Sequence, residues 1–106
     1  MLVVNRTNQV ISMKLIVSSN NLIEVMGKCI FENTDYIALQ YPQLLSAQNS
    51  GTESPPKIAL LNFMVAGNNE RVEIYKSQIL AIALASETAR TEYEKVATKL
   101  TGGQKV

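Results

Sequence analysis

A short polar segment, Lys76-Ser77-Gln78, separates two apolar runs, Val72–Tyr75 and Ile79–Leu84. Three residues are too few for an α-helix, and the segment lacks the Asn-Gly or Asp-Gly pair that a tight hairpin prefers. A lysine in a turn is most often only solvated. A lysine with two small polar neighbours can also bind a ligand, and we expect this turn to face one.

The composition excludes most catalytic and metal chemistry. The chain contains no histidine, one cysteine (Cys29), one aspartate (Asp35) and eight glutamates with no pairing typical of a carboxylate dyad. His/Cys zinc sites, Ser-His or Cys-His catalysis and a disulfide framework are therefore excluded. No glycine-rich phosphate loop occurs either. We expect a protein that is not an enzyme and that has no metal and no cofactor.

Charge and apolar content bear on the partners of the chain. The formal net charge is +1, so any contact with nucleic acid must be local rather than a property of the whole surface. Apolar residues make up 46% of the chain and charged residues 18%, which favours burial of apolar surface between copies. The N-terminus does not read as a signal peptide, and no run approaches the roughly 20 apolar residues of a membrane span. We expect a soluble, cytoplasmic protein.

The pattern of residues predicts a curled sheet of about five short strands. Gly27 interrupts one strand, as at a bulge or strong bend, and Cys29 in the same strand is most simply a core residue. Residues 46–57 contain Ser, Asn, Gly and a Pro pair and predict a surface loop. The strand-like runs are 13–17 (from as early as 10), 22–30, 36–41 (or on to 45), 58–65, 72–75 and 79–84.

The hydrophobic period changes near the C-terminus, where a helix is predicted over about 87–100. Ser86 is the candidate N-cap, and Gly102-Gly103 would end the helix. One apolar stripe follows helical spacing; its members are Ala85, Ala89, Tyr93, Val96 and Leu100.

These elements predict a single domain over 1–106, mostly β, in which a small, strongly bent five-stranded barrel over about 10–85 precedes the C-terminal helix. The last strand is apolar on both faces, with Leu80, Ile82 and Leu84 alternating with Ile79, Ala81 and Ala83. Such a strand should be buried and paired at its edge. Pairing with a neighbouring copy would meet this need and would form a ring or a fibre.

Three segments resemble the Sm-like (LSm) superfamily, in particular bacterial Hfq. Residues 75–79 followed by 80–82 resemble the second Sm motif, in which a Tyr-Lys-His turn precedes an apolar strand. Residues 25–29 resemble the bent, glycine-containing strand of the first motif, and 36–39 resemble its third strand. The resemblance spans 13–85, and some viruses of bacteria encode small proteins of this type.

The chain also departs from this pattern. The helix of the family precedes the barrel, whereas the predicted helix follows it. Ser77 stands where Hfq has histidine, and either Asn33 or Asp35 can correspond to the aspartate of the first motif. The long insert between Leu45 and Val72 is not Hfq-like.

The resemblance implies a homo-oligomeric ring that binds single-stranded RNA at its central pore, in a bacterium or a phage-infected bacterium. The implied RNA-binding residues are Asn33, Asp35, Tyr36, Lys76 and Ser77, and the expected oligomer interface contains Ile79, Ala81 and Ala83. Two alternatives stay open: a ring-forming structural or assembly protein without RNA binding, and a barrel that binds a small ligand.

Overall fold

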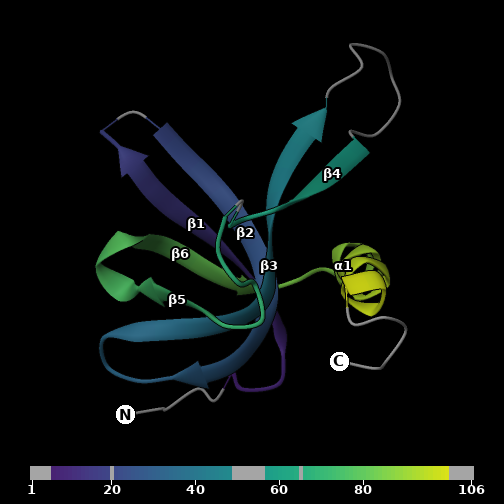
Figure 1. Cartoon of the computed structure of the whole chain (residues 1–106). Coiled ribbons are helices and arrows are strands. Elements are labelled where there is room, and N and C mark those ends of the chain that lie inside the picture. The colour runs from purple at the N-terminus through teal and green to yellow at the C-terminus, as the bar shows by residue number, and fades with distance from the viewer. Residues whose placement is uncertain (1–5, 20, 49–56, 65, 101–106) are drawn as a thin grey trace.

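A computed structural model describes residues 6–19, 21–48, 57–64 and 66–100 of the chain. The protein is mostly β with one C-terminal helix, as predicted (Figure 1). The elements are β1 (Val10–Ser18), β2 (Asn21–Glu32), β3 (Tyr36–Gln48), β4 (Lys57–Asn62), β5 (Val72–Tyr75), the 3₁₀ turn η1 (Lys76–Gln78), β6 (Ile79–Leu84) and α1 (Glu87–Leu100).

Over the described residues the sheet has six strands, so the prediction of five is wrong. β4 and β5 both pair antiparallel with β3, on its C-terminal and N-terminal halves respectively. β3 bends between these halves, so a single straight partner cannot follow it. The connection between β4 and β5 is fastened at this bend, because the backbone N–H of Tyr41 donates to the carbonyl of Asn69 at 2.7 Å.

The prediction of a closed barrel is also wrong for the part of the chain that the structure describes. The hydrogen-bonded strand order is β4-β3-β2-β1-β6, with β5 on β3, so β5 and β6 do not pair with each other. They are consecutive in sequence, but η1 turns the chain from β3 toward β1 between them. The result is a strongly bent, open antiparallel sheet (Figure 1).

The bend lies where Gly27 of β2 meets Pro42 of β3, and it confirms the structural role predicted for this glycine. The register between the strands shifts between Met26 and Lys28. A Cβ atom on Gly27 would lie 3.1 Å from the Cβ of Leu39 and 3.2 Å from the Cα of Pro42, closer than ordinary contact. Glycine therefore allows the close approach of the two strands, which a larger residue would permit only if Leu39 or Pro42 shifted.

The prediction of a surface loop over 46–57 is wrong at both ends of the segment. β3 continues to Gln48 and β4 begins at Lys57, and these two residues are register partners. Backbone pairing between the two strands extends both of them into the predicted segment, and composition alone does not reveal such pairing. The remaining residues of that prediction, 49–56, lie outside the described residues.

Two groups of buried residues stabilise the described part of the chain. The larger lies within the folded sheet and includes Cys29, which confirms its assignment as a core residue. The smaller lies between the sheet and α1 and contains Met26, Ala89, Tyr93 and Ala97.

Helix α1 begins as the sequence predicts, since the backbone N–H of Ala89 donates to the Ser86 hydroxyl at 3.2 Å. The buried face is shifted from the predicted stripe, because Ala97 is buried while Leu100 is 41% exposed. The small side chains of Ala89 and Ala97 let the helix approach the sheet on either side of Tyr93. The predicted end at residues 102–103 lies outside the described chain. No helix in the described ranges is both long and apolar enough to cross a membrane.

Candidate functional site

The fold brings together the two polar turns that the sequence singles out. The backbone N–H of Lys76, at the start of η1, donates to the carbonyl of Asp35 at 2.8 Å. Tyr36, the first residue of β3, is the register partner of Tyr75, the last residue of β5. Residues about 40 positions apart in sequence thus form one continuous surface.

The turn between β2 and β3 is stabilised by Asn33. Its side-chain carbonyl accepts the backbone N–H groups of Asp35 and Tyr36, both at 2.8 Å. This Asx-type geometry is a turn-forming role. Asp35 itself is exposed, so its carboxylate is open to a ligand.

The side chain of Lys76 forms an ion pair with a residue outside its turn. Its Nζ atom lies 2.9 Å from Oε2 of Glu32, and the same carboxylate accepts two hydrogen bonds of 2.8 Å from Nη1 of Arg6. The Lys76 side chain is 35% exposed, and Ser77 beside it is exposed. A ligand that approaches η1 therefore meets two cations that share one acidic group.

Glu32 is charged under ordinary conditions. Burial by itself would raise the pKa of its carboxyl, but the hydrogen bonds from Lys76 and Arg6, together with their charges, outweigh burial and lower the pKa. Glu32 also contributes, after burial, to the raised pKa of the nearby Cys29 thiol. This raised pKa and the complete burial of Cys29 argue against a reactive thiolate.

An aromatic cluster adjoins the two turns. The Tyr36 ring lies 5.9 Å from the Phe31 ring and 6.0 Å from the Tyr75 ring, measured between centroids. Arg71 lies over the Phe31 ring, with its Cζ atom 5.5 Å from the ring centroid. Tyr36, one of the predicted site residues, is therefore the central ring of this cluster.

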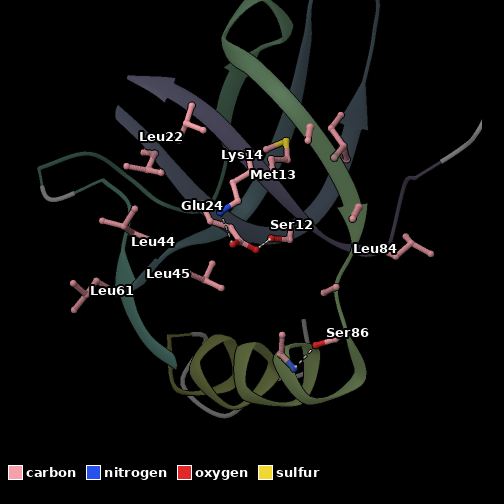
Figure 2. A pocket seen from close by; sticks show the side chains of 16 residues that line it. Ser12, Met13, Lys14, Leu22, Glu24, Leu44, Leu45, Leu61, Leu84 and Ser86 are labelled. Carbon is pink, nitrogen blue, oxygen red and sulfur yellow. Dashed lines mark hydrogen bonds and ion pairs between the residues drawn. The ribbon is translucent and has the colours of Figure 1, made fainter. Parts of the chain in front are cut away.

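Elsewhere, a cleft of about 820 Å³ opens between α1 and the sheet (Figure 2). Its lining includes exposed leucines from three strands, Leu22, Leu61 and Leu84. Its polar side chains are engaged with their neighbours: Lys14 lies 3.3 Å from Glu24, which also accepts a hydrogen bond from Ser12. The cleft is therefore mainly an apolar surface.

The three predicted interface residues have different environments. Ala81 and Ala83 are exposed and line this cleft, whereas Ile79 is half-buried and packs against the main core. A register shift between Lys14 and Leu15 causes the difference, because Leu15 pairs with Ile79 while Lys14 pairs with Ala81. The strict alternation predicted for this strand is thus broken at Leu80.

Four residues beside the two polar turns were not predicted from the sequence: Arg6, Phe31, Glu32 and Arg71. A charged residue next to an aromatic one at the end of β2 is a weak signal. The contact of Glu32 with Arg6 spans 26 residues and depends on tertiary structure. Over the described ranges, no group of three or more His, Cys, Asp or Glu side chains is placed to hold a metal ion.

Comparison with models of known protein families gave no match, and comparison with curated proteins gave no significant one.

Proposed function

We propose that the protein is an Sm-like subunit of a homo-oligomeric ring that binds single-stranded RNA, in the cytoplasm of a bacterium or a phage-infected bacterium. The observation that carries this proposal is the junction of the two turns, in which the backbone N–H of Lys76 donates to the backbone carbonyl of Asp35 at 2.8 Å. This junction joins the segments on which the resemblance to the Sm motifs rests. The bent β2 and β3 strands around Gly27 support the same assignment.

The residues at the junction suit unpaired RNA. Tyr36 offers a ring on which a base can stack, a contact worth roughly 1–3 kcal/mol. Asp35 and Ser77 are exposed and can form hydrogen bonds with the edges of unpaired bases. Lys76 supplies positive charge for phosphate. In this proposal Asn33 acts mainly through the turn that it stabilises.

The ion pairs around Glu32 determine how much positive charge the site offers. Arg6 and Lys76 together carry two positive charges and Glu32 carries one negative charge, so the cluster has a net charge of about +1. A ring would repeat this charge once per subunit around the pore. RNA phosphate has to compete with Glu32 for Lys76, so we propose moderate, salt-sensitive affinity.

Fluorescence anisotropy with short U-rich and A-rich RNA at two salt concentrations tests the proposal. Lys76→Ala should weaken binding and flatten its salt dependence, whereas Glu32→Gln should strengthen binding by releasing Lys76. Lys95→Ala is a matched control, since Lys95 is paired with Glu92 at 3.2 Å on the distant α1 helix. Unchanged binding in Lys76→Ala would exclude the turn as the RNA site.

A second candidate function, assembly without RNA binding, is favoured by the apolar cleft beside β6. Leu80 and Leu84 of this strand are 59% and 63% exposed, a large apolar exposure for an edge. A neighbouring copy that pairs with β6 would cover this surface. A well-formed ring that binds neither RNA would favour this function over the first.

A further inference from the structure

The aromatic cluster lies on the outer face of the sheet, opposite the core. Ile37 and Ile74 point inward and are buried, and Tyr36 and Tyr75 come from adjacent positions on the same two strands. Phe31 and Tyr75 are 42% and 57% exposed. Large aromatic side chains that remain exposed in a group are candidates for a binding surface.

Arg71 is held in place at the edge of this cluster. Its guanidinium lies over the Phe31 ring, approaches the Tyr36 hydroxyl at 3.5 Å and is paired with the Glu73 carboxylate at 3.2 Å. The Arg71 side chain is still 46% exposed. A planar guanidinium with one face on a ring can stack a second flat group on its other face.

We propose that Phe31, Arg71 and Tyr75, with Tyr36 between them, form an aromatic platform on which successive unpaired bases of an RNA strand stack. The inference rests on the proposed function and extends it, because Tyr36 belongs to both the junction of the turns and the platform. An RNA strand that contacts Lys76 would continue over Tyr36 toward Arg71 and Phe31.

The geometry favours bases over an apolar protein partner. The three rings are tilted to one another, by 43° between Phe31 and Tyr36 and by 68° between Tyr36 and Tyr75, so they do not form one flat patch. Centroid steps of 5.9 and 6.0 Å let Tyr36 and Tyr75 contact different bases, while a base above Phe31 stacks on the Arg71 guanidinium that lies over that ring. Stacking of this kind accepts any base, because every base has a π-face.

Two conservative variants test the platform. Phe31→Leu keeps an apolar side chain but removes the π-face, and Arg71→Lys keeps the charge but removes the planar guanidinium. Each should weaken RNA binding roughly 5- to 100-fold while leaving the slope of affinity against salt unchanged. Leu100→Ala is the control, because Leu100 is 41% exposed on α1 and should leave affinity unchanged.

The readouts are anisotropy of a labelled U-rich RNA, fluorescence of 2-aminopurine placed in the same RNA, and light scattering of each variant. Wild-type protein should quench 2-aminopurine by stacking, and both variants should reduce this quenching. If wild-type protein binds RNA but both variants bind and quench as well as it does, the platform is wrong and the proposed function stands. If wild-type protein binds no RNA, the proposed function itself fails. If Phe31→Leu changes the oligomeric state, the cluster is an interface between copies and the inference is overturned.

Discussion

Glu32 is the residue on which the electrostatics of the candidate site depend most. It accepts hydrogen bonds from Arg6 and is paired with Lys76, and each partner is itself only partly exposed. Despite the cost of burial, these contacts lower the pKa of Glu32 below its ordinary value of 4.5. The ionised carboxylate therefore contributes to the stability of the folded chain.

We predict that this contribution disappears in acid. Because the pKa of Glu32 is lower in the folded than in the unfolded chain, its carboxylate stabilises the folded protein at pH values above the unfolded pKa near 4.5. This stabilisation is lost as the pH falls through the lower pKa of the folded state. Glu32→Gln should show a smaller loss of stability over this window than wild type. Urea unfolding followed by circular dichroism at several pH values measures this. Equal pH dependence in both proteins would contradict the prediction.

At the scale of elements, the bend shared by β2 and β3 depends on Gly27. We predict that Gly27→Ala destabilises the protein by about 1–3 kcal/mol, because the added methyl would press on the Leu39 side chain and the Pro42 backbone. Gly67→Ala is the matched control. A Cβ there would lie 3.1 Å from the flexible end of Met64, which can move aside, so the change should stay within about 0.5 kcal/mol. Equal effects in denaturant unfolding would show that the bend does not need glycine.

The attachment of α1 to the sheet depends on Tyr93. Its hydroxyl donates to the carbonyl of Gln40 and accepts the backbone N–H of Lys28 at 3.1 Å, so it bridges β2 and β3 beside their register shift. Tyr93→Phe would leave two backbone groups without these partners and should cost about 1–3 kcal/mol.

A second measurement separates this hydroxyl from the packing of the ring. Burial raises the pKa of Tyr93 from its ordinary value of 10.0 to about 12. Its stabilising contribution should therefore be present below pH 10.0 and fade as pH rises toward 12, whereas Tyr93→Phe should lack this loss. Identical alkaline unfolding of the two proteins would contradict the bridging role.

At the scale of the whole molecule, β6 determines the expected assembly. Within the described chain it pairs only with β1, so its other edge is open to a second copy. We predict that light scattering at micromolar concentration gives a mass several times that of one chain. Ala81→Lys should shift the protein toward the monomer, since a charged side chain at an exposed strand edge opposes pairing. A monomeric wild type would exclude both the ring and the assembly function.

Local sequence was sufficient for several features of this protein. The change from strand to helix near Ser86, the helix cap itself, the bend at Gly27 and the burial of Cys29 were all predicted and are all present. Each depends on side-chain periodicity or on the steric limits of one residue, which neighbours a few positions away reveal.

Tertiary structure alone decided the sharing of β3 by two strands, the open sheet, the position of Ile79 and the pairing of Glu32 with Arg6 and Lys76. The resemblance to the Sm motifs assigned residues of both polar turns to one site, and the fold places the two turns side by side. The charge cluster behind Lys76 could not be predicted in this way. The register shifts and bends of the strands determine which charged side chains lie next to Glu32. The shifts and bends themselves depend on packing among residues that are far apart in the chain.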